Sequence, residues 1–307
     1  MVTGSFGYTG GYITRRLLDE GRRVRTLTRR PGGDHPLATR IEAVPLQFGD
    51  RDALIDALRG ANTFYNTYWR RFPDPNVGFQ DIVEQSRTLI DAARTAGVQR
   101  LVQFSVANAS RDAPTSYFVA KAEVEEIVRN SGLSFAIIRP TLLHGPGDIL
   151  INNLAWALRR LPVFAMPGDG SYSVQPVFAG DVAELAIRRA SQPGDVTVDA
   201  SGPEVYPFAD LVRLIRRQIG SRSLVIGLPW SLFLAGTRVV GRALRDVVLT
   251  RDELVELTSE LLVSPDAPTC STAFSEWLAA ERQTVGRRYA SELARNVRSA
   301  SWAAARP

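Results

Sequence analysis

The chain is poor in several residues that carry chemistry in other proteins: its 307 residues include one cysteine, two histidines and a single lysine. The lone thiol, Cys270, excludes an internal disulfide and fits a reducing compartment. No group of His, Cys, Asp and Glu has the spacing of metal ligands, so we predict no bound metal. The longest uncharged apolar stretch, 223–237, is shorter than the ~20 residues needed to cross a bilayer.

Basic residues outnumber acidic ones by 37 to 32, but they are scattered. All of them except Lys121 are arginine, and no basic run reaches the five to eight residues typical of a nucleic-acid patch. We therefore predict no nucleic-acid partner. The scattered basic residues indicate arginine used in place of lysine throughout the chain, which draws attention to the one lysine that remains.

Strand-like and helix-like segments alternate in the first half of the chain. Strands are expected near 2–4, 24–27, 41–46, 63–65, 100–105 and 135–138, with helices near 53–58, 78–96 and 117–128. This alternation predicts an α/β fold of Rossmann type, with a doubly wound parallel sheet. After Pro140, strands are expected at 174–178 and 196–199 around a helix that starts near Asp181. Helices are then expected near 208–219, 230–245, 250–262 and 274–298.

These segments predict a nucleotide-binding domain over 1–205 and a smaller, mostly helical substrate part over 206–307. Residues 146–173 are expected to contribute to a substrate cleft. Only three residues precede the first glycine turn, whereas a central strand usually has ~5–6, which favours a true start upstream of Met1. Since no secretory signal precedes the turn, we expect a cytoplasmic protein.

Residues 3–10 read TGSFGYTG, a strand-to-helix turn of the form TGxxGxxG. In such a turn Gly4 allows a sharp bend, Gly7 lets a pyrophosphate approach the backbone, and Gly10 lets the helix pack closely on the strand. An ordinary glycine turn has the same composition, but the strand before it and the helix after it favour a dinucleotide site. The residues expected to contact the cofactor here are Gly4, Ser5, Phe6, Gly7 and Tyr8.

The end of the second predicted strand indicates which cofactor is bound. Arg29 and Arg30 follow this strand, and no acidic residue is present to accept a hydrogen bond from a ribose 2′-hydroxyl. Arginine at this place favours the 2′-phosphate of NADP, with NAD as the alternative. Asp50, after the third strand, either receives the adenine amine or caps the helix that follows.

A second group of residues suggests acid–base chemistry. Tyr117 and Lys121 are four residues apart, which places them on one face of the predicted helix. A neighbouring ammonium stabilises a tyrosinate, and lysine can also hold the nicotinamide ribose. Ser105, at the end of a predicted strand, can bind the same substrate oxygen. A solvated helix face would show the same spacing, but the only lysine of the chain lies here.

Together with residues 138–148, which read IRPTLLHGPGD, these motifs resemble the short-chain dehydrogenase/reductase superfamily in its extended and atypical branches. The likeness covers about the first 220 residues. It implies NAD(P) binding, an acid–base role for Tyr117 and a ribose contact from Lys121. It also places Pro140, Thr141 and Leu143 near the nicotinamide. Segments 116–123 and 148–153 look most similar to the NAD(P)H-binding group that includes an NADPH-holding accessory subunit of respiratory complex I and relatives linked to quinone biosynthesis.

One segment departs from the pattern, because residues 65–72 read YNTYWRRF where epimerases have small residues. Bulky side chains there reshape the pocket and count against a sugar-nucleotide substrate. His144 fits either a catalytic role or a loop position near the cofactor.

Three functions remain open: an NAD(P)-dependent oxidoreductase or epimerase acting on a small molecule, a non-catalytic NADPH-binding module of a respiratory or quinone-related assembly, and a redox-sensing regulator. The apolar stretch around Trp230 either covers the substrate cleft, which we favour, or makes peripheral contact with a membrane through 224–240. The segment 274–298 packs on the body or on a second copy in a homodimer.

Overall fold

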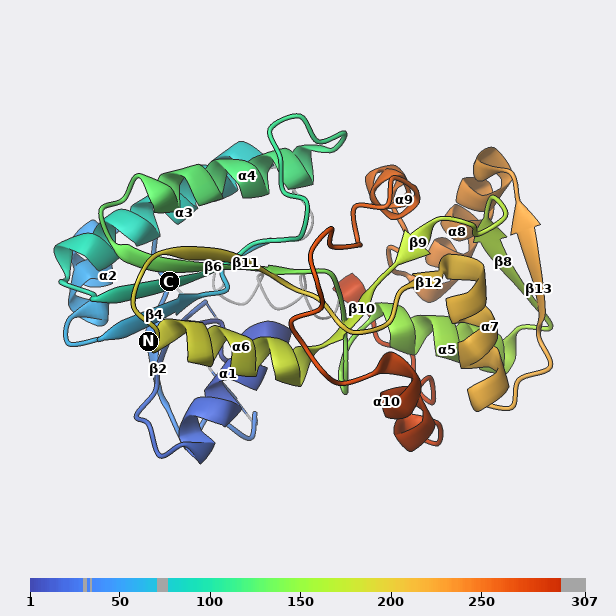
Figure 1. Ribbon diagram of the computed structural model, residues 1–307, viewed down its shortest axis with the longest axis horizontal. Helices are drawn as coiled ribbons and strands as arrows, with labels where there is room; N and C mark the ends of the chain where they lie inside the picture. Colours follow the sequence, from blue (N-terminus) through green and yellow to red (C-terminus); the bar gives the residue numbers. More distant parts are fainter. Residues whose placement is uncertain (30–31, 34, 71–76, 294–307) are drawn as a thin grey trace. The chain divides into compact units, whose positions relative to one another are not determined.

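The computed structural model describes residues 1–29, 32–33, 35–70 and 77–293, which form two compact units (Figure 1). Unit 1 contains residues 1–140 and 179–200, and unit 2 contains residues 141–178 and 201–293. The sequence predicted a nucleotide-binding domain over 1–205 and a helical part over 206–307, with the two parts interleaving around 145–205. The chain enters unit 2 after Pro140 and returns to unit 1 for one more helix and strand before it leaves again.

Unit 1 is built on a seven-stranded parallel sheet, which confirms the predicted fold class. The strand order is β11-β6-β5-β4-β1-β2-β3, so the chain winds outward from β1 in both directions. The strands are β1 (Val2–Thr3), β2 (Arg25–Thr28), β3 (Glu42–Pro45), β4 (Thr63–Asn66), β5 (Arg100–Phe104), β6 (Ser134–Pro140) and β11 (Val196–Ala200).

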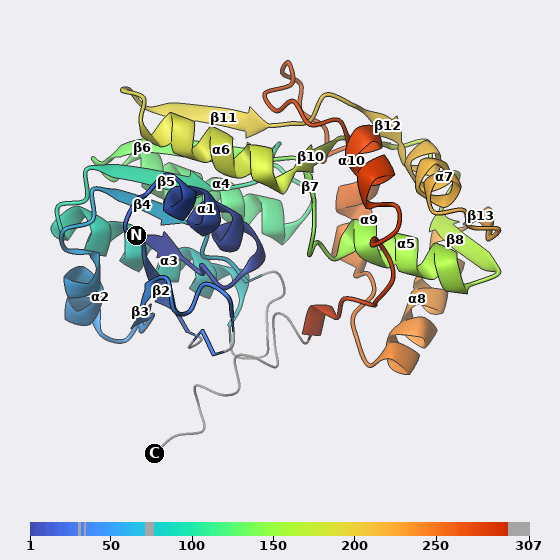
Figure 2. The ribbon, with the colours of Figure 1, turned by 90° about the horizontal axis from the view of Figure 1, so that it is seen from below.

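Helices cover both faces of this sheet (Figure 2). One face carries α1 (Tyr8–Asp19) and α6 (Ala179–Ala190), and the other carries α2 (Arg51–Leu58), α3 (Phe79–Thr95) and α4 (Ser116–Arg129). The face of α3 expected from helical spacing, including Ile82 and Leu89, is fully buried. Burial of each such side chain stabilises the unit by about 1.5–3 kcal/mol.

Arg100 fastens the last part of unit 1 to the middle of the sheet. It is buried at the first position of β5, and its guanidinium donates to Ser134 Oγ at 2.6 Å, the Gly194 carbonyl at 2.8 Å and the Arg189 carbonyl at 3.0 Å. Arg189 lies in the last turn of α6, and Gly194 lies between α6 and β11. Two partners of this buried guanidinium are therefore far away in the sequence, whereas its Nε has no partner among the described residues.

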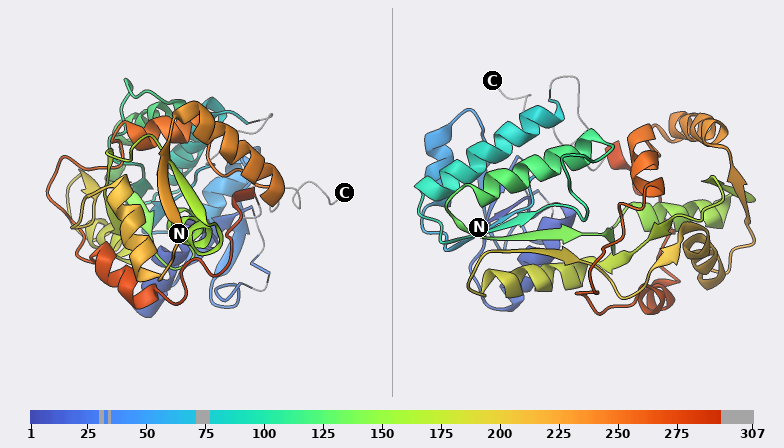
Figure 3. Two further views of the ribbon diagram at one scale, coloured as in Figure 1. Left: turned by 90° about the vertical axis from the view of Figure 1, so that its right-hand side faces the viewer. Right: turned by 45° about the horizontal axis from the view of Figure 1, so that its top comes forward.

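Unit 2 combines helices with three two-stranded sheets (Figure 3). Two pairs are parallel: β7 (Leu142–His144) with β10 (Pro176–Phe178), and β8 (Val163–Pro167) with β13 (Leu224–Leu228). The third, β9 (Ser173–Val174) with β12 (Tyr206–Pro207), is antiparallel. The helices are α5 (Leu150–Arg160), α7 (Phe208–Gln218), α8 (Trp230–Leu244), α9 (Arg251–Thr258) and α10 (Phe274–Glu281). None of the described helices is long and apolar enough to span a membrane.

The long helix expected over 274–298 is wrong, because α10 ends at Glu281 and turns follow. The chain then passes so close to α5 that a Cβ on Gly286 would lie 2.5 Å from backbone atoms of Ala155 and Trp156. Asn152 on α5 accepts a hydrogen bond from the Gly286 amide at 3.0 Å. This packing stops the helix. Residues 294–298 lie outside the described residues. Phe274 and Leu278 bury α10 within unit 2.

Candidate cofactor and active site

The glycine turn between β1 and α1 has a geometry that side chains would disrupt. Gly4 has φ +67°, and its amide donates to the Leu27 carbonyl at 2.9 Å. A Cβ on Gly10 would lie 2.3 Å from the Gly4 carbonyl oxygen, far inside van der Waals contact. Gly4 therefore turns the chain and Gly10 lets α1 lie against the end of β1, as a dinucleotide-binding turn requires.

The rest of the turn is held from within the unit. Ser5 is fully buried, its hydroxyl accepts from Thr14 Oγ1 at 2.7 Å, and its amide donates to Thr26 Oγ1 at 3.1 Å. Ser5 thus fastens the turn to α1 and β2. Gly7 is the N-cap of α1, and no side chain caps this helix end. Its first-turn amides are suited to bind a phosphate. Direct cofactor contacts from Ser5, Phe6, Gly7 and Tyr8 stay predictions.

The glycine turn lies where the strand order reverses. The neighbours β1 and β4 lead to opposite halves of the sheet, and ligands of such sheets bind beyond the carboxyl ends of these strands. Thr67, just after β4, donates its amide to Thr3 Oγ1 at 2.7 Å and its hydroxyl to the Thr3 carbonyl at 2.6 Å. Asn66 donates to Gln103 Oε1 at 2.8 Å, which extends the polar contacts to β5. The sequence analysis missed this network, although polar residues directly after a buried strand are a signal for it.

The structure describes two of the three residues predicted to contact the adenosine half of the cofactor, Arg29 and Asp50. Arg29 directly follows β2 and is half-buried. Burial raises the pKa of Tyr68, and the positive charge of Arg29 partly opposes this shift. Arg30 lies outside the described residues. Asp50 is the N-cap of α2 and accepts from the Ala53 amide at 2.9 Å, so the capping alternative is what the structure shows. An adenine contact from Asp50 stays a prediction.

Lys121 is buried on α4 beneath aromatic side chains. Its ammonium lies 3.8 Å from the ring centroid of Trp69 and 5.7 Å from that of Tyr117, and it donates to the Phe104 carbonyl at 3.4 Å. Burial lowers the pKa of Lys121 to about 7, although the nearby Glu125 opposes this shift. The only lysine of the chain is therefore close to losing its charge at neutral pH.

Ser105 follows directly after Phe104, the residue whose carbonyl accepts the Lys121 hydrogen bond. Ser105 is buried, and its Oγ has no hydrogen-bond partner in the part of the chain that the structure describes. Its amide donates to the Ile138 carbonyl at 2.8 Å, which continues the pairing of β5 and β6. A buried, unsatisfied hydroxyl costs about 1–3 kcal/mol, so its retention suits a position that a ligand satisfies.

The bulky segment after β4 reaches this site. The indole of Trp69 packs edge-on against Tyr117 at 5.5 Å between ring centroids and stacks with Phe79 at 6.2 Å. The Trp69 ring lies against the Lys121 ammonium, so the departure from the epimerase pattern alters the surroundings of the lysine itself. Residues 71 and 72 of this segment lie outside the described residues.

Glu125, one helical turn after Lys121, is almost completely buried and holds two arginines. Its carboxylate accepts from Arg139 at 2.8 and 2.5 Å, and from Arg129 at 2.8 Å. Because Arg139 lies on β6, this bidentate pair fixes the rotation of α4 on the sheet. The sequence analysis did not identify Glu125.

His144 has an environment that opposes acid–base catalysis near neutral pH. It lies on strand β7 of unit 2, not in a loop, and packs against Phe178, Phe274 and Trp277. Burial lowers the pKa of His144 to about 3, so the imidazole is neutral in the folded protein.

The remaining predicted cofactor contacts lie on either side of the unit boundary. Pro140 ends β6 in unit 1, whereas Thr141 and Leu143 belong to unit 2, and their cofactor roles stay predictions. Among the described residues, no group of three or more His, Cys, Asp or Glu could hold a metal.

Comparison with known proteins identifies the family. Residues 4–149 match the model of an NAD(P)H-binding family. The chain is 32% identical over 235 residues to the (4-alkanoyl-5-oxo-2,5-dihydrofuran-3-yl)methyl phosphate reductase of Streptomyces griseus, which covers 75% of this chain and 74% of the relative. The chain belongs to the NAD(P)H-binding family. The predicted resemblance to atypical short-chain dehydrogenases/reductases is thereby confirmed.

Two further comparisons place this NAD(P)H-binding protein among its relatives. It is 25% identical over 292 residues to the mitochondrial "NADH dehydrogenase [ubiquinone] 1 alpha subcomplex subunit 9" of Arabidopsis thaliana, covering 87% of this chain and 71% of that protein. Its fold matches an NADPH-dependent quinone oxidoreductase of Escherichia coli, solved with NADPH, with a TM-score of 0.72 and 23% identity over 92% of this chain and 98% of that one. The chain is thus similar both to a reductase and to a subunit of NADH dehydrogenase.

Proposed function

We propose that the protein is an NADP(H)-dependent oxidoreductase that interconverts a hydroxyl and a carbonyl group on a small molecule. The observation that carries this proposal is the arrangement at the end of β5. There the unpartnered hydroxyl of Ser105 follows the carbonyl that binds Lys121, and Tyr117 lies next to the same lysine. A purely structural lysine is rarely kept buried at such a cost.

Each side chain has a defined task in the reducing direction. A nicotinamide cofactor held over the glycine turn would supply the hydride that reduces the substrate carbonyl. The Tyr117 hydroxyl donates its proton to the substrate oxygen, which becomes the product hydroxyl, and the Ser105 hydroxyl donates a hydrogen bond that orients this oxygen. Lys121 would hold the ribose hydroxyls of the cofactor and, while it is protonated, would stabilise the tyrosinate that remains until a proton from solvent restores Tyr117.

The preference for the phosphorylated cofactor rests on Arg29, which follows β2 where NAD-dependent relatives of this fold carry an acid. Thermal unfolding with NADPH, NADP, NADH and NAD tests this part. A site saturated a hundredfold stabilises the protein by about 2.7 kcal/mol, and we expect this gain with the phosphorylated pair alone. Arg29→Glu should abolish the difference between NADPH and NADH. Equal stabilisation of the unchanged protein by all four cofactors would disprove the preference.

The catalytic part is tested with Tyr117→Phe, using NADPH oxidation in the presence of aldehydes, ketones and quinones. We expect turnover to be lost while NADPH affinity stays within a few-fold, because the ring remains and only the proton donor is removed. Tyr12→Phe, which removes a phenol hydroxyl on α1, is the matched control and should keep full activity. Full activity in Tyr117→Phe would remove this residue from the mechanism.

A second candidate is a non-catalytic NADPH-binding module of a respiratory or quinone-related assembly. Trp69 favours it, because its indole covers the ammonium that would otherwise contact the nicotinamide ribose, and the likeness to the complex I subunit agrees. This candidate predicts stabilisation by NADPH without turnover on any carbonyl or quinone. It also predicts that the protein is recovered from its source within a larger complex.

A further inference from the structure

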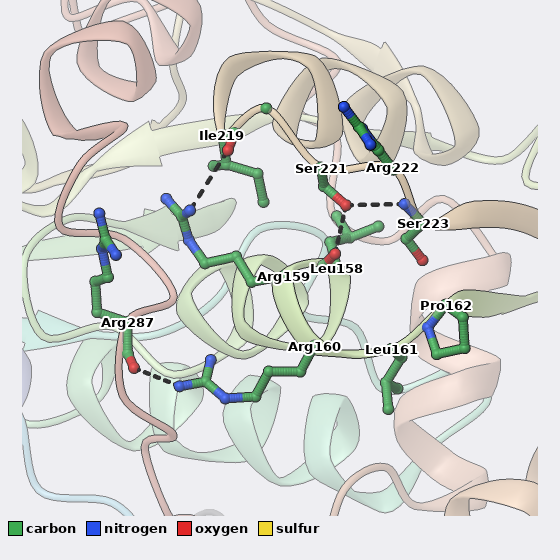
Figure 4. Close-up of a pocket in the computed structure, with 11 residues that line it drawn as sticks. Leu158, Arg159, Arg160, Leu161, Pro162, Ile219, Ser221, Arg222, Ser223 and Arg287 are labelled. Atoms are coloured by element: carbon green, nitrogen blue, oxygen red, sulfur yellow. Dashed lines mark hydrogen bonds between the residues drawn. The ribbon is translucent and has the colours of Figure 1, made fainter.

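Unit 2 contains a cavity of about 670 Å³ that is lined with basic side chains (Figure 4). Its lining comes from the end of α5, the turn between α7 and β13, and Arg287. We call it the arginine cavity, after Arg159, Arg160, Arg222 and Arg287. Within the described ranges, none of these four side chains forms an ion pair with a carboxylate.

Backbone carbonyls, not acids, hold Arg159 and Arg160. Arg159 donates to the carbonyl of Val285 at 3.0 Å. It also donates to the carbonyl of Ile219 at 3.4 Å, and Arg160 donates to the carbonyl of Arg287 at 2.8 Å (Figure 4). Burial lowers the pKa of Arg159, and the charges of Arg287 and Arg160 lower it further. The positive charges therefore repel one another, and an anion in the cavity relieves this repulsion.

A hydroxyl group adds to the donors of the cavity. Ser223 is 3% exposed and lines the cavity, and its Oγ has no partner among the residues that the structure describes. The Ser223 amide donates to Ser221 Oγ at 3.1 Å, which fixes the turn. Guanidinium groups with a hydroxyl donor are the chemistry that proteins use to bind phosphate.

The strands beside the arginine cavity expose apolar side chains. Leu161 lines the cavity and is exposed, and Leu224, paired with Val163 at the start of β13 and β8, is 60% exposed. Helix α8 follows β13 and packs against β8, as Figure 3 shows in orange in its left panel. Of its fifteen residues only Gly241 is buried, and Val239 is 69% exposed.

The charge of this region has one sign. Residues 211–245 contain seven arginines and no aspartate or glutamate. An ordinary solvated helix mixes both signs, and a helix of a soluble core buries its apolar face. A helix with exposed apolar side chains, whose charged residues are all basic, has the composition of an amphipathic helix in the interface of an anionic bilayer.

We propose that unit 2 docks on an anionic phospholipid bilayer, with α8 in the interfacial layer and a lipid phosphate in the arginine cavity. Leu161, Val163 and Leu224 enter the acyl boundary around the bound headgroup. This inference concerns a surface of unit 2 and is independent of the proposed reaction in unit 1.

Sedimentation of the full chain with vesicles tests the proposal. We expect binding to phosphatidylcholine mixed with phosphatidylglycerol and little binding to phosphatidylcholine alone. Arg222→Ser/Arg287→Ser should weaken binding about 30-fold, at about five-fold per arginine near such a surface. The matched control is Arg23→Ser/Arg40→Ser, which removes two exposed charges from unit 1 and should change binding much less.

A second variant, Leu232→Ser/Val239→Ser, tests the role of α8. Both side chains are exposed, so the variant should remain folded but should lose vesicle binding. Equal binding to both kinds of vesicle would overturn the role of the arginine cavity. Stabilisation by inorganic phosphate that depends on Arg222 and Arg287, without vesicle binding, would assign the cavity to a soluble anion instead. A vesicle-free dimer that Leu232→Ser/Val239→Ser separates would assign the surface to a second copy.

Discussion

The depressed pKa of Lys121 can be measured directly, because this residue is the only lysine in the chain. Protein grown with carbon-13-labelled lysine gives a single side-chain signal, whose shift against pH is the titration curve of one ammonium. We expect a midpoint near the structural value of about 7, well below the ordinary 10.5. A midpoint above about 9.5 would refute the reasoning that burial controls this charge.

The same shift has a consequence for stability. The folded protein holds Lys121 neutral above about pH 7, whereas the unfolded chain keeps the proton up to about 10.5. The unfolded state therefore binds more protons in this window, and the free energy of unfolding rises with pH by up to about 1.4 kcal/mol per pH unit. Over the whole window the contribution is about 5 kcal/mol. Between about pH 8 and pH 9.5 this group should raise the free energy of unfolding by about 2 kcal/mol. Lys121→Met should lack this rise, and urea unfolding at the two pH values measures it.

Trp69 supplies the control for the cause of the shift. The indole lies 3.8 Å from the ammonium and is one of the groups that exclude water from it. Trp69→Ala should admit water and raise the midpoint of the lysine signal towards its ordinary value. Tyr206→Phe, in unit 2, should leave it unchanged. An unchanged midpoint in Trp69→Ala would mean that other groups dehydrate Lys121.

Two further predictions concern the glycine turn and the buried histidine. Gly10→Ala should destabilise unit 1 by about 3 kcal/mol or more in urea unfolding and should abolish cofactor binding, because its Cβ would overlap the Gly4 carbonyl. Gly49→Ala, with open space around it, should be nearly neutral. His144 should lower the free energy of unfolding as the pH falls from about 6.5 towards 3, because in this range only the unfolded chain protonates this imidazole. In His144→Phe, the free energy of unfolding should lack this dependence on pH. A slope that persists in the variant would have to come from other groups.

The sequence was most informative where one physical rule acts alone. Parallel strands and crossover helices produced an alternation that predicted the sheet of unit 1, and the spacing of Ile82 and Leu89 predicted the buried face of α3. The glycine turn was also recognisable, since a sharp turn and a close helix contact each require glycine. The proximity of Lys121 and Tyr117 followed from helix geometry.

Other features depend on contacts between distant segments, which spacing does not show. The short strands β7, β8, β12 and β13 were missed because the strands that they pair with lie far apart in the sequence. Helix α5 was missed as well. The burial of Lys121 depends on Trp69, more than fifty residues earlier, which was noted as bulky but not as its cover. Glu125 looked like one more charge on a helix, and only β6 brings Arg139 to it.

The contacts of Arg100 constrain the order in which the protein folds. Its guanidinium on an inner strand donates to the carbonyls of residues 189 and 194, which leave the ribosome almost a hundred residues later. Until residues 179–200 are synthesised, the edge of β6 lacks its partner β11, and the face of α1 that packs against α6 is uncovered. Most of unit 2's first segment, 141–178, is therefore synthesised before the nucleotide-binding unit can close. A fragment that ends at Pro140 should behave as an aggregation-prone intermediate, so the minimal folding unit of the first domain extends at least to Ala200.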